Sequence, residues 1–327
     1  MAEIDAAIDA GSSGTPPSAD DDALLATRAV IAVHLGHLAS AEQGAVAGDV
    51  EAVHDLRVAT RRLRAALRLF EPLLPKPLAD GARRELRRLA KAVGAVRDLD
   101  VLGETMRARA VRLDPELRAG LGPLAVAIHD QHLAAVTALA KVLDSSPWRR
   151  TRERLVAFTR STAASRRRER LGSIAARLVQ PPLRSARRAG HRLTLGSPAS
   201  EFHRVRIRVK RLRYVLETMR GVGGRSVEKL VARLRSIQDI LGIHQDATVA
   251  VAWLRAYAAR PGVEAAVLLP VGAVIQALRK RSQKAQRRAL EAWWKLERAR
   301  LFEDVLAGLS DDAAAERGVT PRRRVGA

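Results

Sequence analysis

Apolar residues recur at spacings of three and four along most of the chain, with polar and charged residues between them. This period places the apolar side chains on one face of an α-helix. No segment shows the sustained Val, Ile or Thr alternation, bounded by hairpin turns, that is typical of strands. The pattern therefore predicts an all-α protein.

Glycine and proline residues divide this pattern into pieces of helix length. Gly94 and Gly242 are expected to end helices, because glycine is favoured just after the last helical turn. Pro181-Pro182 is expected to separate two helices. The predicted helices lie near residues 23–46, 51–71, 78–93, 97–112, 122–144, 149–178, 182–193, 199–219, 225–241, 244–259 and 263–307.

Two sequence motifs occur twice, in the same order. VHDLRVATRRLRAALRLFEPL from Val53 aligns without a gap with FHRVRIRVKRLRYVLETMRGV from Phe202, at an offset of 149 residues. LRRLAKAVGAVRDLDV from Leu86 matches LRSIQDILGIHQDATV from Leu234, at an offset of 148 residues. Two motifs at nearly one offset indicate an internal duplication. We expect two helical halves that meet near residues 144–150 and are related by a pseudo-two-fold axis.

In each copy the first motif predicts a helix with a basic face and a separate apolar face. At about 100° per residue, the basic residues fall within an arc of roughly 80°. The basic arcs hold His54, Arg57, Arg61, Arg64 and Arg68 in the first copy, and His203, Arg206, Lys210 and Arg213 in the second. The apolar faces, expected in the core, hold Leu56, Ala59, Leu63, Leu67 and Phe70, and Leu212, Leu216 and Met219.

The single sign of the basic face is the informative feature. No acidic residue lies between Asp55 and Glu71, although helix faces in water commonly mix opposite charges at this spacing. Like charges one turn apart repel, so the stripe is either a solvated surface or a face that binds a polyanion. The planar arginine fork suits phosphate. The repetition of the stripe favours the second interpretation.

The charge of the whole chain points the same way. Its 327 residues include 58 Lys+Arg and 35 Asp+Glu, a formal net charge of +23. Residues 1–22 contain six acids and no base, so the remainder carries +29. Nucleic acid, an anionic membrane surface and another phosphate polymer are the candidate partners. Aromatic residues make up only 3% of the chain, and Tyr214 is expected off the basic arc. A polyanion without bases is therefore favoured, with duplex DNA as the alternative.

Further basic residues extend these arcs. Arg62 and Arg211 lie within the two motif helices, Arg87 and Lys91 follow in the next helix of the first copy, and Arg235 matches Arg87. Lys284 and Arg288 lie roughly on one side of the last predicted helix.

Residues with catalytic or metal-binding patterns are few. The chain has no cysteine, no Walker loop, no G-x-S-x-G and no zincin motif. Asp98 and Asp246 are expected to cap the helices after Gly94 and Gly242 or to pair with arginine, and this is favoured over catalysis. His54 and His203 either bond locally or bind phosphate, with the second interpretation slightly ahead. We expect no catalytic residue, metal or cofactor.

The two ends differ from the body. Residues 1–22 lack the features of a signal peptide and are expected to form a disordered acidic tail, and 311–327 a disordered basic tail. No apolar run approaches the roughly 20 residues that span a bilayer. We expect a cytoplasmic protein without a membrane partner, with helical halves at 23–146 and 147–310.

The sequence resembles the CHAD domain, the conserved histidine α-helical domain. The resemblance rests on V-H-D-L-R-V-A-T-R-R-L-R at 53–64, L-x-x-L-x-x-x-x-G-x-x-R-D-x-D-V at 86–101 and their second copies, and it covers about residues 23–310. It implies two four-helix bundles around a basic channel, binding of inorganic polyphosphate through His, Arg and Lys, and association with polyphosphate granules. Some members carry a CYTH triphosphate-processing domain, for which no segment here is long enough. The second copy has Ser236 and Asp239 opposite Arg88 and Lys91, so it is expected to offer fewer phosphate contacts there.

The resulting expectation is non-enzymatic binding of inorganic polyphosphate. Its alternatives are binding of the nucleic-acid backbone and processing of polyphosphate. The expected phosphate ligands are His54, Arg57, Arg61, Arg62, Arg64, Arg68, Arg87, Lys91, His203, Arg206, Lys210, Arg211, Arg213, Arg235, Lys284 and Arg288.

Overall fold

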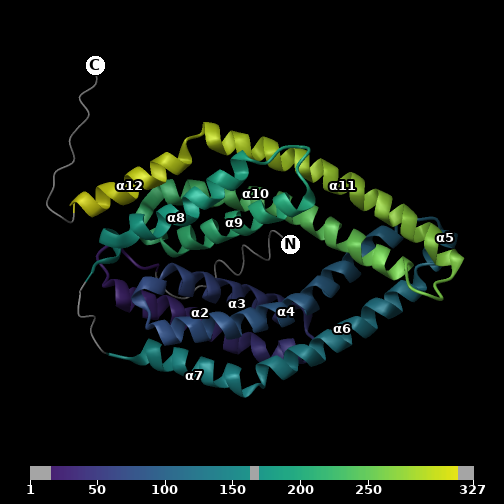
Figure 1. The fold of residues 1–327 in the computed structure, drawn as a ribbon, viewed down its shortest axis with the longest axis horizontal. Helices are drawn as coiled ribbons and strands as arrows, with labels where there is room; N and C mark the ends of the chain where they lie inside the picture. The colour runs from purple at the N-terminus through teal and green to yellow at the C-terminus, as the bar shows by residue number, and fades with distance from the viewer. Residues whose placement is uncertain (1–15, 163–168, 316–327) are drawn as a thin grey trace.

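The computed structural model describes residues 16–162 and 169–315, with side chains to residue 310, and these residues form helices joined by short turns (Figure 1). The predicted all-α class is confirmed, since the described ranges contain no strand beyond one isolated bridge between Asp22 and Arg170. The elements are α2 (Ala23–Val46), α3 (Val50–Leu69), η1 (Glu71–Leu73), α4 (Lys76–Ala110), α5 (Pro115–Ala119), α6 (Gly122–Leu143), α7 (Ser146–Arg160), α8 (Leu171–His191), α9 (Ala199–Thr218), α10 (Arg220–Ala258), α11 (Ala265–Arg298) and α12 (Leu301–Ala315).

Two hydrophobic cores lie on either side of a contact between α3 and α9. The first core packs α2, α3, α4, α6 and α7 around side chains such as Leu63 and Trp148. The second packs α8 to α12 around Phe202 and Trp293, and also takes in Phe70. Figure 1 shows the two groups of helices as layers, with α3 and α9 on their facing sides. The two motif helices therefore lie next to each other.

A third core joins the two layers at one end. Leu102 and Met106 of α4 pack there with Ala250 and Leu254 of α10, together with the first turns of α6 and α11. In Figure 1 the layers converge at this end, beside α5. The C-terminal halves of α4 and α10 therefore connect the two layers and fix the distance between them.

The helices α4 and α10 continue through the glycines that were expected to end them. Gly94 lies inside α4 and Gly242 inside α10, so the predicted helix ends at these positions are wrong. Asp98 and Asp246 consequently lie inside helices, and the N-cap prediction for them is also wrong. The apolar face of α4 stays buried on both sides of the glycine, at Val93 and Val96. This burial outweighs the roughly 1 kcal/mol by which glycine disfavours a helix interior.

Replacing Gly94 by alanine is expected to stabilise the protein. An added Cβ would have no heavy atom within 4 Å, and the backbone is helical. The free energy of unfolding should rise by about 0.5–1 kcal/mol, measured by urea denaturation. Gly242→Ala should behave alike. A loss of stability in both variants would instead indicate helix ends at these positions.

Other boundaries differ because tertiary packing decides them. Pro181-Pro182 lies inside α8, where Val179 and Leu183 are buried in the second core on either side of it. The predicted helix 149–178 is two helices, α7 and α8, and residues 163–168 between them lie outside the described residues. The predicted helix 263–307 is also two, separated where Arg300 has a φ of 52°.

The first layer extends beyond residue 146, the predicted boundary between the halves. Trp148 and Leu155 of α7 are buried in the first core. Residues 16–22, assigned to the acidic tail, are ordered: Leu171 N–H donates to Asp21 C=O at 2.9 Å, and Gly172 N–H to Ala19 C=O at 2.9 Å. At the other end α12 continues to Ala315. Residues 1–15 and 316–327 lie outside the described residues.

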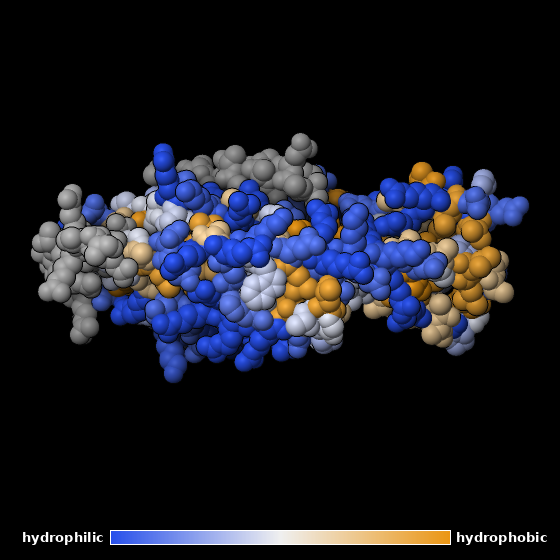
Figure 2. All heavy atoms as spheres, turned by 90° about the horizontal axis from the view of Figure 1, so that it is seen from above, coloured by the Kyte–Doolittle hydropathy of each residue, from blue (hydrophilic) through white to orange (hydrophobic). Residues whose placement is uncertain are grey.

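The helix α2 is long and apolar enough to cross a membrane by length and composition alone, contrary to the expectation that no segment is. Its buried residues pack in the cores of this fold, as Ile31 and Leu38 do against α3. Figure 2 shows hydrophilic residues over most of one face and hydrophobic residues gathered at one end. Leu268 and Leu269, 44% and 69% exposed, lie in the first two turns of α11.

Candidate functional site

The basic and apolar faces of α3 and α9 lie where their spacing predicts. Leu56 and Leu63 of α3, and Leu212 and Leu216 of α9, are fully buried in the two cores. With each apolar face turned to its own core, the remaining faces of the two helices meet in the contact between the layers. The contact therefore brings together side chains from two basic stripes.

Four cations gather in this contact, two from each helix, and they are called here the central cation cluster. Its members are Arg57, Arg61, Arg206 and Lys210. Arg61, Arg206 and Arg57 all act on Lys210 as repelling charges. The two stripes, which the sequence presents as separate faces, thus form one shared concentration of positive charge.

The pKa values of Lys210 and Arg206 show that their positive charges are disfavoured in this contact. Burial, followed by repulsion from Arg61, Arg206 and Arg57, lowers the pKa of Lys210 well below its usual value. Burial also lowers the pKa of Arg206, with Asp246 opposing and Arg57 and Arg61 adding to the shift. Both lowered pKa values mean that the free protein disfavours the charged forms of these two side chains. A bound anion would stabilise the charged forms.

Two carboxylates compensate part of the charge. Arg57 Nη1 donates to Asp98 Oδ1 at 2.9 Å, which confirms the arginine partner foreseen for this residue. Burial raises the pKa of Asp246, against the effect of Arg206 and Lys210. Two acids against four cations leave the cluster with an excess of positive charge.

A small cavity of about 110 Å³ opens at one end of the cluster. Arg57, Asp98, His203, Arg206 and Asp246 are among the residues that line it. The Nδ1–H of His203 donates to Gln245 Oε1 at 2.7 Å, which fixes the ring on the cavity wall. The cavity is large enough to admit a phosphate group.

Tyr214 belongs to this site although the helical arc excluded it. Its ring lies under two guanidinium groups, with Arg213 Cζ 4.7 Å and Arg61 Cζ 5.1 Å from the ring centroid. The side chain is only 4% exposed, and its hydroxyl has no hydrogen-bond partner among the described residues. A buried hydroxyl without a partner is costly, so this one is available to a ligand. Residue spacing along α9 could not predict this position of Tyr214, because Arg61, which lies over the ring, belongs to α3.

A second group of cations extends the charge along the same two helices. Burial, followed by repulsion from Arg68 and Arg87, lowers the pKa of Arg64. Burial and then Arg68 lower the pKa of Arg211 across the layers. Arg68 and Arg211 also line a cavity of about 800 Å³ between η1, α8 and α9. The expected ligands Arg64, Arg68, Arg87 and Arg211 therefore lie close enough to act on one another.

Two expected ligands, Arg213 and Arg235, are held in ion pairs. Arg213 is 3% exposed and donates to Glu217 Oε1 at 2.5 Å and to Gln238 Oε1 at 3.0 Å. Arg235 Nη2 lies 3.7 Å from the same Glu217 oxygen. These arginines hold α9 against α10, a role that the stripe pattern does not distinguish from ligand binding.

The remaining expected ligands lie apart from the central cation cluster. Lys91 is exposed on α4, and Lys284 and Arg288 are exposed on α11, which packs on α10. Arg62 lines a different pocket, between α2 and α9. His54 is half-buried on α3, next to Asp55, whose pKa burial raises and His54 lowers.

Asp98 and Asp100, two residues apart on α4, do not form a pair. Asp98 points to Arg57, whereas Asp100 Oδ1 lies 2.9 Å from His132 Nε2. Among the described residues no group of three or more His, Asp or Glu side chains could hold a metal ion. The contact between Asp100 and His132 therefore holds α4 to α6.

Comparison with known proteins now decides the family. The family model of the CHAD domain matches residues 29–255, which include both motif helices and the central cation cluster. The chain belongs to the CHAD-domain family. The crystal structure of the CHAD domain from the plant Ricinus communis is similar, with a TM-score of 0.67 and 27% identity over 86% of this chain and 95% of that one. PptA from Streptomyces chartreusis has the same fold, with a TM-score of 0.67 and 21% identity over 85% of this chain and 99% of that one.

Two uncharacterized proteins of Mycobacterium tuberculosis, from strains CDC 1551 and H37Rv, are each 28% identical to this CHAD protein over 207 residues. The match covers 61% of this chain but only 39% of each relative. The chain therefore matches well under half the length of these curated relatives.

Proposed function

We propose that this CHAD protein binds inorganic polyphosphate between α3 and α9 and does not turn it over. The observation that carries the proposal is the central cation cluster, where Arg57, Arg61, Arg206 and Lys210 repel one another in a half-buried contact. Such an arrangement costs stability unless an anion occupies it. A chain of phosphates supplies regularly spaced negative oxygens that arginine forks bind well.

The proposal includes a duplicated architecture around a basic groove. The two motif helices lie on facing sides of the layers, and the third core pairs Leu102 of α4 with Ala250 of α10, at the offset of the repeated motifs. In this account the two halves present equivalent basic faces to one ligand. The outer cations at Arg64, Arg68 and Arg211 would continue the phosphate path. Localisation in the cytoplasm, at polyphosphate granules, is the corresponding cellular expectation.

A competition assay tests the choice of ligand. Labelled long-chain polyphosphate is bound at roughly 0.15 M salt and challenged with duplex DNA at equal phosphate concentration. We expect DNA to displace little of it, because a duplex is too wide to enter the cavity of about 110 Å³ beside the central cation cluster. Equal displacement would support a nucleic-acid-binding protein instead. Incubation with Mg²⁺ and polyphosphate, scored for released phosphate, tests the absence of turnover, and sustained release would assign an enzyme.

Replacing Tyr214 by phenylalanine is expected to weaken polyphosphate binding about fivefold. The hydroxyl is buried without a partner among the described residues, so the variant loses one hydrogen bond to the ligand. Stability should be unchanged or slightly higher, because the free protein gains nothing from this hydroxyl. Calorimetric titration and urea denaturation measure the two quantities. Unchanged affinity would remove Tyr214 from the site.

Binding is expected to take up protons at pH values above the free-state pKa of Lys210. The free protein holds the pKa of Lys210 well below its usual value, mainly by burial and repulsion. Bound phosphates favour the ammonium form and raise that pKa, so affinity should fall as the pH rises through the free-state value. Titration calorimetry in buffers of different ionisation enthalpy measures the uptake. Lys210→Met should abolish it, and an unchanged uptake in that variant would contradict this role for Lys210.

A further inference from the structure

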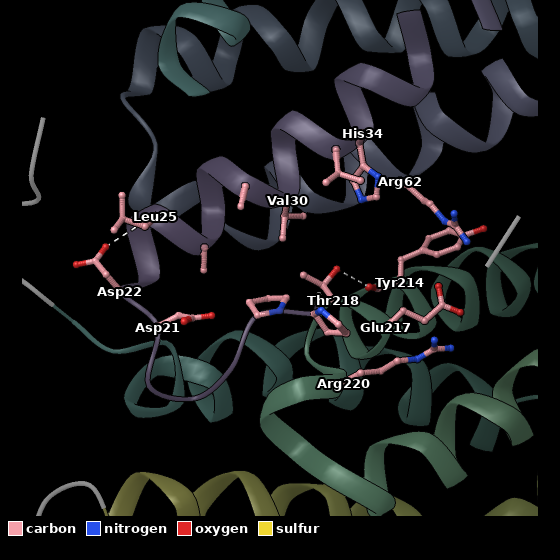
Figure 3. Close-up of a pocket in the computed structure, with 15 residues that line it drawn as sticks. Asp21, Asp22, Leu25, Val30, His34, Arg62, Tyr214, Glu217, Thr218 and Arg220 are labelled. Carbon is pink, nitrogen blue, oxygen red and sulfur yellow. Dashed lines mark hydrogen bonds between the residues drawn. The ribbon is translucent and has the colours of Figure 1, made fainter. Parts of the chain in front are cut away.

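A pocket outside the central cation cluster has the features of a small-molecule site. It has a volume of about 410 Å³, within the roughly 300–1,000 Å³ typical of ligand pockets. One side is α2, the other is the end of α9 and the start of α10, and residues 16–22 close it from below (Figure 3). Tyr214 also lines this pocket, but none of the four cations of the central cation cluster does.

The side of α2 that lines the pocket carries apolar residues in addition to those that α2 buries in the cores. Leu25, Val30 and Val33 line the pocket, and Leu25 is 58% exposed. The opposite side of the helix is already buried, at Ile31 and Leu38. A helix that is apolar all round is normally covered on every side. The apolar composition that lets α2 resemble a membrane span is thus explained if this wall receives an apolar ligand.

The closing segment is firmly held. Ala23 N–H donates to Glu169 C=O and Leu171 N–H to Asp21 C=O, both at 2.9 Å. A Cβ at Gly221 would come within 2.4 Å of the Pro17 carbonyl oxygen, so the segment lies directly on the start of α10. Pro16 and Pro17 therefore form a fixed wall of the pocket.

The two ends of the pocket differ in charge. One end has the basic residues Arg62 and Arg220 and the imidazole of His34 (Figure 3). The one acid there, Glu217, is already bonded to the buried Arg213 at 2.5 Å. At the other end, Asp22 Oδ1 accepts from the N–H groups of Leu24 and Leu25, and Asp21 Oδ2 from that of Ser18.

His34 adds a donor at the basic end. Its Nδ1 is buried and has no hydrogen-bond partner among the described residues. Burial, and then Arg62, lower the pKa of His34 to about 3, so the ring is neutral at neutral pH. A neutral imidazole can place its proton on Nδ1 and donate it to an anionic oxygen.

We propose that this pocket binds a small amphipathic anion, with its apolar body along α2 and its carboxylate or phosphate at His34, Arg62 and Arg220. Leu25 and His34 are nine residues apart, which is about 14 Å along a helix and fits a body on the order of ten carbon atoms. The acids at the opposite end fix the orientation. This site shares Tyr214 with the polyphosphate proposal but includes none of the four cations of the central cation cluster.

Calorimetric titration with decanoate, decyl phosphate, decanol and decylamine tests the proposal on the full chain. Both anions should bind more tightly than decylamine, and shortening decanoate by two carbons should weaken binding about tenfold. The relative affinity of decanoate and decyl phosphate identifies the preferred head group. Absence of binding by both anions, or equal binding of decylamine, would overturn the proposal.

Matched variants localise the binding. Ala29 is exposed and lines the pocket, so Ala29→Trp should fill it and abolish binding of both anions, whereas Ala134→Trp on the exposed face of α6 should not. Arg62→Gln with Arg220→Gln should weaken anion binding at least tenfold and leave decanol unchanged. Both pocket variants should retain their melting temperature. Equal anion binding by Ala29→Trp and wild type would place the ligand elsewhere.

Discussion

Neutralising the central cation cluster is expected to lower polyphosphate affinity by at least 100-fold. The variant carries Arg57→Gln, Arg61→Gln, Arg206→Gln and Lys210→Gln together. Each cation that contacts a phosphate releases counterions on binding, so the slope of log affinity against log salt should flatten by about three. The free protein should melt close to wild type, because relief of the repulsion among the four half-buried charges offsets the loss of the Arg57–Asp98 ion pair and of the cations beside Asp246. Salt-dependent titrations and thermal melts measure these quantities.

The matched control removes the same number of charges from the solvent-exposed surface. It carries Gln in place of Arg150, Arg154, Lys229 and Arg233, all of which are exposed on α7 or α10. Its net charge equals that of the cluster variant, so a purely long-range effect of charge would weaken both alike. We expect it to retain most of the affinity and the salt slope. Equal losses in the two variants would mean that α3 and α9 carry only solvated stripes.

Replacing Gly190 by alanine is expected to reduce the free energy of unfolding by about 3 kcal/mol. An added Cβ would lie 2.0 Å from Trp293 Cε2, and Trp293 is 1% exposed in the second core. Neither α8 nor the indole ring can move without opening that core. Urea denaturation measures the loss.

The same substitution in α2 is the control for Gly190→Ala. A Cβ added at Gly36 would have no heavy atom within 4 Å, so Gly36→Ala should stabilise by about 0.5–1 kcal/mol. A small loss in both variants would show that the packing of α8 on Trp293 is looser than this structure has it.

Periodicity predicted the helical class and the apolar faces of α3 and α9, because those features depend on residues close in sequence. The ends of α4 and α10 were predicted wrongly at Gly94 and Gly242, since packing on both sides of each glycine keeps the helix continuous. The helix across Pro181-Pro182 is continuous for the same reason. Local propensity is a weak guide wherever a long apolar face is buried.

The candidate site, like the fold, could be predicted from the sequence only in part. The spacing of Arg57, Arg61, Arg206 and Lys210 marked them as one-sided stripes, yet their meeting in one cluster depends on how the layers pack. Arg213 belongs to the same stripe but lies in a buried ion pair with Glu217, four residues further along the same helix. Tyr214 joins the site through Arg61 of the other layer. Contacts between residues some 150 positions apart have no signature within a single helix.

The most direct test is a crystal structure of the protein with a short polyphosphate chain. We expect phosphate oxygens between α3 and α9, within hydrogen-bond distance of Arg57, Arg61, Arg206 and Lys210, with Tyr214 Oη directed at one of them. Phosphates bound only on the exposed cations of α11, such as Lys284 and Arg288, with the contact between α3 and α9 empty, would contradict it.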